Sequence, residues 1–267
     1  MKKIALFSVV ILLFLVSCSE MDKESGCGGC LDGCCDESKE DEKLADTGSA
    51  APETSGTGGT GDAGSQKPAF PSPYRSKSYN DEDESDFYLR EGPQSRITQE
   101  MKNIADSISG SGGMDTVEGI MEWEKSNLHD CGDKSQLRQR TAGEIIDSGC
   151  AQGCTDYGLV FVALARAKGI PASYADTIRD SYLQEIIDDG RISGTFYGHV
   201  FSDVLVDGSW KTVDPTAGRT LSSAGGYELD NRKYTLFARG LDNSDLGYTS
   251  DDEFKRSVAS AYGIQYN

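Results

Sequence analysis

Histidine and basic side chains are scarce in this chain of 267 residues. It has only two histidines, and its 26 lysines and arginines are outnumbered by 44 aspartates and glutamates, for a net charge of −18. The sequence has no basic stripe that could neutralise phosphates, which argues against nucleic acid as a partner and against attraction to anionic lipid headgroups. Phosphate-cradling and dinucleotide-binding motifs are also missing, so we expect no metal or organic cofactor. If this chain is an enzyme that uses an imidazole base, that base must be one of its two histidines.

Long apolar runs are missing except at residues 4–16, which follow the positively charged start Met-Lys-Lys. This run is too short for a comfortable membrane span and has the form of an export signal. It ends in Leu-Val-Ser-Cys at residues 15–18, which resembles the lipobox of prokaryotic lipoproteins. We therefore expect residues 1–17 to be a signal peptide and a lipid on Cys18 to hold the chain on the outer, or periplasmic, face of a prokaryotic membrane. A plain secretory signal and an uncleaved anchor are the alternatives, and all three export the chain.

Residues 18–95 are poor in large apolar side chains and rich in Gly, Ser, Thr, Asp and Glu. Such a segment cannot bury enough apolar surface to offset the entropy of ordering it, so we expect a disordered acidic tether with an r.m.s. span of roughly 50 Å. A cysteine cluster lies within this tether. In an exported chain with no histidine nearby, a disulfide knot explains the cluster better than a metal clip does, and the pairing stays open. The cluster consists of Cys27, Cys30, Cys34 and Cys35.

Folded character begins near residue 96 and continues to the last residue. Apolar residues at helical spacing predict a helix over about residues 97–108, and the acidic pattern at Asp115 predicts the N-cap of a second helix. Thr141 with Glu144 three residues later has the form of a capping box ahead of a short third helix. The sequence therefore predicts several packed helices before the central part of the chain.

The apolar run after Cys154 predicts a buried helix that stops at Gly169, with Pro171 beyond it. Cys154 then lies in the first turn, where backbone N–H groups and the positive end of the helix dipole stabilise a thiolate. Alternation, turn residues and caps predict the remaining elements. These are strands at residues 172–178, 199–206 and 210–213, a short helix at 182–187, and a helix at 251–262 capped by Ser250.

Asp207 and Gly208 are typical of a two-residue hairpin turn. In that register Phe201 lies opposite Asp214, so Asp214 is the diagonal neighbour of His199 on the same face, with backbones about 7 to 8 Å apart. A side-chain hydrogen bond between His199 and Asp214 would fix the imidazole tautomer and leave its other nitrogen for a thiol.

Three segments, in order along the chain, resemble the core of the transglutaminase-like superfamily. They read Gly-Cys-Thr-Asp-Tyr at residues 153–157, Gly-His-Val-Phe at 198–201, and Gly-Ser-Trp-Lys-Thr-Val-Asp-Pro-Thr at 208–216. The resemblance covers roughly residues 96–267. It implies an α+β, papain-like fold in which a buried helix with an N-terminal cysteine packs on an antiparallel β-sheet.

The same resemblance implies a thiol acyl-transfer site. Cys154 would be the nucleophile, His199 the general base and later acid, and Asp214 the group that orients His199. We favour hydrolysis of amide bonds in proteins or peptides outside the cytoplasm, because nothing in the sequence indicates a water-excluding acceptor tunnel. Protein-glutamine crosslinking and a non-catalytic surface binding module of the same fold are the alternatives, because the superfamily includes crosslinkers, peptidases, deglycosylating amidases and inactive members.

Each site residue also has a purely structural explanation. Cys154 could be a structural thiol at a helix start, His199 a strand histidine satisfied by its neighbours, and Asp214 a turn-forming residue ahead of Pro215. His129, in a polar stretch, is the alternative base.

Two groups are candidate oxyanion donors. The backbone N–H of Cys154 is a natural donor, and the amide of Gln152 is a candidate second donor. Trp210 is more simply explained as a packed sheet residue than as a substrate platform.

Of the eight cysteines, six remain after Cys18 is assigned to lipid and Cys154 to catalysis. Four of them form the tether cluster, which leaves Cys131 and Cys150 to pair with each other. A disulfide across this loop would contribute on the order of 3 kcal/mol by restricting the unfolded chain. Two unpaired buried thiols are the alternative.

Overall fold

The structure is a computed structural model, and it describes residues 83–110, 112–221 and 224–266. The signal peptide predicted for residues 1–17, the lipid on Cys18 and the four-cysteine cluster of the tether therefore lie outside the described residues. Within the part of the chain that the structure describes, no helix combines the length and the apolar character needed to cross a membrane.

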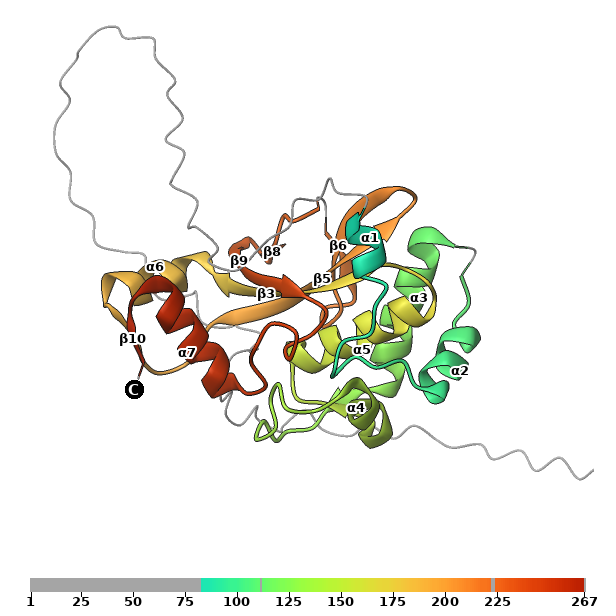
Figure 1. Ribbon diagram of the computed structural model, residues 1–267, viewed down its shortest axis with the longest axis horizontal. Helices are drawn as coiled ribbons and strands as arrows, with labels where there is room; N and C mark the ends of the chain where they lie inside the picture. The colour runs from blue at the N-terminus through green and yellow to red at the C-terminus, as the bar shows by residue number, and fades with distance from the viewer. Residues whose placement is uncertain (1–82, 111, 222–223, 267) are drawn as a thin grey trace, which may run out of the picture. The chain divides into compact units, whose positions relative to one another are not determined.

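A buried helix, α5 (Cys154–Ala167), forms the centre of the helical part of the fold (Figure 1). Nearly all of its residues are buried, which explains why the sequence is apolar on every side of this helix rather than along one stripe. The helices that pack around it are α2 (Gln99–Ser107), α3 (Gly113–Asn127) and α4 (Ala142–Ser148). The element that carries Cys154 is therefore enclosed by the rest of the fold.

Local sequence sets the ends of these helices. At the start of α4 the hydroxyl of Thr141 accepts from the Glu144 N–H (3.3 Å), and the Glu144 carboxylate accepts from the Thr141 N–H (2.8 Å), which confirms the predicted capping box. After α5, Gly169 has a φ of 75°, and the Ile170 N–H donates to the Ala165 carbonyl (2.9 Å). This left-handed glycine ends the helix where the sequence predicts.

Helix α3 begins earlier than predicted. The N-cap is Gly112, and the predicted N-cap Asp115 lies inside the first turn. Gly112 and Gly113 have φ values of 110° and 56°, a backbone conformation that a pattern of acidic residues does not reveal. Asp115 still lies where a negative charge is favourable, near the positive end of the helix dipole.

Among the described residues, six antiparallel strands form the main sheet, in the order β7-β6-β5-β3-β9-β8. The hairpin between β5 and β6 turns at Asp207 and Gly208, whose φ values are 50° and 73°, and Ser202 pairs with Val213 in the predicted register. The strand bounds are β3 (Ala172–Arg179), β5 (Gly198–Val206), β6 (Ser209–Asp214), β7 (Arg219–Thr220), β8 (Glu228–Leu229) and β9 (Arg232–Gly240).

Helices α6 (Asp180–Asp188) and α7 (Asp251–Tyr262) and strand β10 (Gln265–Tyr266) lie toward the other end of the sheet (Figure 1). Helix α6 is longer than the predicted 182–187, and helix α7 has the predicted Ser250 cap. Both contribute to a second core cluster that contains Phe237 and Phe254. Short parallel strands pair as β1 (His129–Asp130) with β2 (Cys150–Ala151), and β4 (Arg191–Ile192) with β10 (Gln265–Tyr266). The fold is α+β, as the sequence predicts.

The described fold starts before the predicted domain boundary at residue 96. A short helix, α1 (Asp83–Phe87), carries Glu84, whose carboxylate is buried and pairs with Arg239 of β9 (3.2 Å). The tether predicted for residues 18–95 therefore does not extend over this stretch. Buried polar pairs order it, and these are invisible to the apolar periodicity from which the boundary was predicted.

Tyr88, just after α1, fixes the same stretch to the sheet. Its carbonyl accepts from the Ala172 N–H at the start of β3 (3.1 Å). Its ring meets the ring of Trp210 edge to face, with centroids 5.7 Å apart. Trp210 therefore packs against a neighbouring aromatic side chain on the sheet.

Candidate functional site

Cys154 is the first residue of α5, and its side chain is nearly completely buried. The N-cap is Gly153, whose φ of 136° favours glycine. Helix geometry places the N–H groups of Cys154 and Thr155 ahead of the first bond along the helix, which the Asp156 N–H donates to the Gly153 carbonyl, and the positive end of the helix dipole lies here. The Cys154 sulfur takes part in a disulfide in this structure. The sequence predicts a free thiol at Cys154, and this thiol would form only when the disulfide is reduced.

The sheet brings the other two predicted site residues together. The Nε2 atom of His199, on β5, lies 3.1 Å from the Oδ2 atom of Asp214, at the end of β6. Both side chains are buried, and in the described part of the chain neither atom has a well-aligned hydrogen bond to any other group. The contact between Nε2 and Oδ2 thus has imperfect hydrogen-bond alignment, and it leaves Nδ1 as the ring nitrogen for a thiol.

Asp214 is held from its other side by the turn that follows β6. Its Oδ1 atom accepts from the Ala217 N–H (3.0 Å). Burial alone would raise the pKa of Asp214, but His199, the Ala217 N–H and Arg219 together outweigh burial and lower this pKa below its usual value. Asp214 is therefore ionised at neutral pH, as a group that orients an imidazole must be.

Aromatic rings flank the imidazole. The ring of His199 meets that of Phe201 edge to face at 4.7 Å between centroids, and Tyr234 of β9 lies at 5.9 Å. Together with Asp214 these rings restrict the orientation of the imidazole.

Helix α5 packs directly on the strand that carries His199. A Cβ atom added at Gly158, one turn beyond Cys154, would lie 2.5 Å from Cγ1 of Val200. Side chains alternate along a strand, so His199 points to the opposite face from Val200. Consistent with this, Val200 shares a core cluster with Cys154, whereas Phe201 belongs to another cluster. Gly158 of α5 thus lies against the residue next to His199 in β5, on the opposite face of the sheet from the His199 side chain. A contact between the reduced Cys154 sulfur and Nδ1 belongs to the proposal below.

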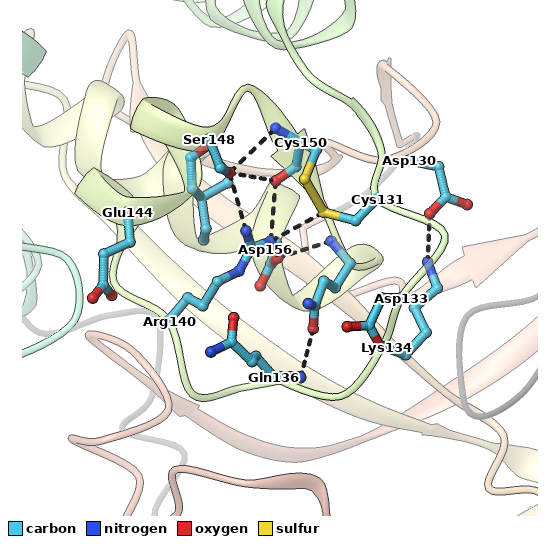
Figure 2. Close-up of polar contacts among 12 residues, drawn as sticks. Asp130, Cys131, Asp133, Lys134, Gln136, Arg140, Glu144, Ser148, Cys150 and Asp156 are labelled. Carbon is cyan, nitrogen blue, oxygen red and sulfur yellow. Dashed lines mark hydrogen bonds and ion pairs between the residues drawn. A yellow bond between two sulfur atoms is a disulfide. The ribbon is translucent and has the colours of Figure 1, made fainter.

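Polar contacts link the candidate oxyanion donor Gln152 to Asp156 and Arg140, for which the sequence predicted no role (Figure 2). The Gln152 N–H donates to Oδ2 of Asp156 (2.8 Å), and Asp156 forms an ion pair with Arg140. The side-chain oxygen of Gln152 accepts from the Gln136 N–H (3.0 Å), so this candidate oxyanion donor is anchored by its acceptor end. In the sequence, Asp156 stood out only as part of the Gly-Cys-Thr-Asp-Tyr segment at residues 153–157, with no role of its own.

Cys131 and Cys150 form the disulfide expected from the sequence, with their Cα atoms 5.1 Å apart. Arg140 lies against it, donating to the Cys150 carbonyl (3.0 Å) with a longer contact to the Cys131 sulfur (3.6 Å). The disulfide and this arginine tie the segment that leads into α5 to the preceding loop.

His129, the alternative base, is exposed on β1. Its backbone pairs with Cys150 in the short parallel ladder. Because His199 is buried against an ionised carboxylate and His129 is not, His199 is the better candidate for the base.

An open groove of about 680 Å³ lies beside the turn that holds Asp214. One wall is α3 and the other is Gly218 with β7. Its lining residues are Glu118, Met121, Glu122, Lys125, Ser126, Gly218, Arg219 and Thr220. Among the described residues, no group of three or more His, Cys, Asp or Glu side chains is arranged to hold a metal ion.

Residues 102–215 match the family model described as the transglutaminase-like superfamily. No curated protein matches the chain. Among solved structures, a "putative cysteine protease" from Cytophaga hutchinsonii is similar with a TM-score of 0.46 and 20% identity, over 62% of this chain and 50% of that chain. A "putative protease" from Parabacteroides distasonis has a TM-score of 0.34 and 13% identity, over 58% of this chain and 29% of that chain.

A third solved structure, a "TGase", has a TM-score of 0.33 and 12% identity, over 69% of this chain and 51% of that chain. The chain thus spans about half, or less, of the length of these similar proteins. The segment that matches the family model contains Cys154, His199 and Asp214, so over this segment the chain is similar to the transglutaminase-like superfamily.

Proposed function

We propose that this protein is an exported thiol acyl-transfer enzyme that hydrolyses amide bonds of proteins or peptides through a thioester on Cys154. The observation that carries the proposal is the buried His199–Asp214 pair on the strand against which the cysteine helix packs. A helix-start cysteine, an imidazole base and a group that orients the base are the parts that nucleophilic acyl transfer requires.

In the first half-reaction Nδ1 of His199 takes the proton of the reduced Cys154 thiol, and the sulfur forms a bond to the carbonyl carbon of the substrate. Backbone N–H groups in the first turn of α5 donate to the oxyanion that develops, with the Gln152 amide as candidate second donor. The imidazolium then protonates the departing nitrogen as the C–N bond breaks. A thioester and a free amine result.

In the second half-reaction a water molecule gives a proton to His199 and attacks the thioester carbon. The C–S bond breaks, the carboxylic acid leaves, and Cys154 returns as a thiolate beside an imidazolium. We favour water as the acceptor because the groove beside the site is open to solvent. If an amine attacked instead, the same steps would crosslink two substrates.

Asp214 does not exchange a proton in this scheme. Its lowered pKa keeps it ionised, so that it holds Nε2 in the protonated form and stabilises the imidazolium formed in each half-reaction. The imidazole is thereby fixed with Nδ1 as the basic nitrogen.

We place the substrate chain in the groove between α3 and Gly218. The groove adjoins the turn whose Ala217 N–H holds Asp214, so a chain lying there would pass the candidate catalytic pair. A volume of about 680 Å³ lies within the range of ligand-binding clefts.

We also propose that the enzyme works outside the cytoplasm, held to a membrane by a lipid on Cys18. The Cys131–Cys150 disulfide supports an oxidising compartment. Growth with a labelled fatty acid should label the wild-type protein, and Cys18→Ala should abolish the label and release the protein from the membrane fraction. An unlabelled wild-type protein in the soluble fraction would contradict the lipid anchor.

The direct test of the reaction uses the full chain after mild reduction, because the Cys154 sulfur is in a disulfide. The protein is incubated with a glutamine-containing peptide and a labelled primary amine, with Cys154→Ala and the unreduced chain as controls. Cleaved peptide or released acid means hydrolysis, and incorporated label means transfer. Neither product, together with no acyl adduct on Cys154 by mass spectrometry, would leave only a binding module of the same fold.

A further inference from the structure

The contacts around Asp156 lead to a second role for this residue, which rests on the proposed function. We propose that Asp156, held in place by Arg140, is a positioning residue that fixes the turn presenting the Cys154 sulfur and the first-turn N–H groups to the substrate.

Asp156 spans the nucleophile from both sides. Its carboxylate accepts from the N–H of Gln152, two residues before Cys154, while its own N–H donates to the Gly153 carbonyl (3.1 Å). Asp156 is only 1% exposed, so water does not compete for these bonds. The residues on either side of Cys154 are thus held in one turn by the side chain and the backbone N–H of Asp156.

Arg140 holds the carboxylate in place. Its guanidinium pairs with Asp156 and donates to the Ser148 hydroxyl (3.1 Å) and to the Cys150 carbonyl (3.0 Å). Figure 2 shows Arg140 between Asp156, Ser148 and the Cys131–Cys150 disulfide. A planar guanidinium can make all of these bonds at once, which the single ammonium of lysine cannot do in the same geometry.

The loop that carries Arg140 is fixed at other points as well. Arg138, two residues earlier, pairs with Asp176 in the central strand β3 and donates to Asn243 (2.8 Å). The Arg138 guanidinium also stacks over the ring of Phe254, at 3.9 Å from the ring centroid. The loop therefore connects the start of the cysteine helix to the sheet that carries His199. Because the loop is fixed to the sheet, Arg140 and Asp156 are held at a fixed position relative to the sheet.

The charge on Asp156 needs its partner. Burial raises the pKa of Asp156, against the lowering effects of the Gln152 N–H, Arg140 and Lys134. An unpaired anion here would also disfavour a thiolate two residues away, because like charges repel. The positive charge of Arg140 offsets this repulsion, so Asp156 can accept the hydrogen bond from Gln152 without destabilising the Cys154 thiolate.

Two variants separate the hydrogen bond from the charge. Asp156→Asn keeps a side-chain oxygen that can accept from the Gln152 N–H, whereas Asp156→Ala removes it, and both variants remove the anion. We expect Asp156→Ala to lower kcat about 100-fold with little change in KM, because a shift near 1 Å at the nucleophile has an effect of this size. Asp156→Asn should restore most of the rate. Asp133→Ala, in the same loop but exposed, is the matched control and should keep wild-type kcat.

The pH profile of Cys154 alkylation provides a readout that a purely structural role would not produce. Both Asp156 variants should shift this profile to lower pH by the same amount, because both leave Arg140 without its anion, yet only Asp156→Ala should lose kcat. If Asp156→Ala fails to fold, Arg140→Lys replaces it in the test. Arg140→Lys keeps the positive charge but loses the planar, multiple hydrogen-bond donors of the guanidinium. It should lower kcat and leave the pH profile of Cys154 alkylation unshifted.

Equal kcat values for Asp156→Ala and wild type, or an equal loss in Asp156→Asn and Asp156→Ala, would overturn the positioning role. If reduced wild type is alkylated at Cys154 but turns over no amide, the proposed function fails. The positioning role is then tested by the rate of Cys154 alkylation at mildly acidic pH, measured with and without the His199→Ala substitution. The difference between these two rates is the part that depends on His199. Asp156→Asn should keep that part and Asp156→Ala should lose it, and the reverse would reject the role.

Discussion

The close contact between Gly158 and Val200 gives a sharp test of how the cysteine helix is seated. In Gly158→Ala the new methyl carbon would lie 2.5 Å from Cγ1 of Val200 and 3.3 Å from Cε2 of Tyr174. Ordinary van der Waals contact begins near 3.4 Å, so the added carbon and the Val200 side chain must separate by about 1 Å. A β-branched valine has little rotamer freedom, so we expect α5 to take most of this shift. The substitution therefore displaces Cys154 relative to His199 without touching either residue.

The effects on stability and on activity should differ in size. Overpacking costs about 1–3 kcal/mol, and replacing a helical glycine by alanine returns about 1 kcal/mol, so the free energy of unfolding should fall only modestly. A displacement of about 1 Å should nevertheless lower kcat about 100-fold. The measurements are urea unfolding and kcat on the amide substrate.

Val200→Ala removes the atom that clashes, so the double variant Gly158→Ala with Val200→Ala should regain most of the lost rate. Gly143→Ala in α4 is the matched control, because its nearest neighbours lie 3.9 Å from the added carbon, and it should stabilise the fold by about 0.5–1 kcal/mol without loss of rate. A Gly158→Ala variant with wild-type kcat would refute the argument that this packing sets the position of the nucleophile.

Three further outcomes are expected. Asp214→Asn should have a lower free energy of unfolding than wild type at neutral pH, measured by urea unfolding. The difference should disappear as the pH falls below ~4 and through the lowered pKa of Asp214 in the folded state. A difference in unfolding free energy that persists in acid would contradict the lowered pKa. The Cys131→Ser, Cys150→Ser double variant should lose about 3 kcal/mol of unfolding free energy in urea, from the entropy of a loop of this length, and no loss would show that the loop is already restricted in the unfolded chain. Thr220→Trp should fill the groove and raise KM at least about 10-fold while leaving the rate of Cys154 alkylation unchanged. Ser107→Trp, at an exposed position away from the groove, is the control. An unchanged KM in Thr220→Trp would place the substrate elsewhere.

Local patterns made much of the fold predictable from sequence. The capping box of Thr141 and Glu144, the end of α5 at Gly169 and the hairpin turn at Asp207 depend on residues a few positions apart, so each is legible without coordinates. The His199–Asp214 pair was also predictable, because hairpin register fixes which residues share a face.

Long-range polar pairs could not be predicted. Glu84 pairs with Arg239 across most of the described chain, and no periodicity connects them, so the fold begins earlier than expected. The pairing of Arg140 with Asp156 was missed for the same reason, since the partner of a charged residue cannot be told from the sequence alone. The disulfide state of Cys154 was missed because cysteine pairing cannot be deduced from spacing alone.

The central claim is that Cys154, His199 and Asp214 act as one chemical unit. Its most direct test is the rate at which a thiol-directed alkylating reagent modifies Cys154 in the reduced full chain at mildly acidic pH, followed by mass spectrometry of the Cys154 peptide. The account predicts rapid labelling in wild type, because the imidazolium stabilises the thiolate, and slow labelling in His199→Ala. Equal rates in wild type, His199→Ala and the denatured chain would contradict it.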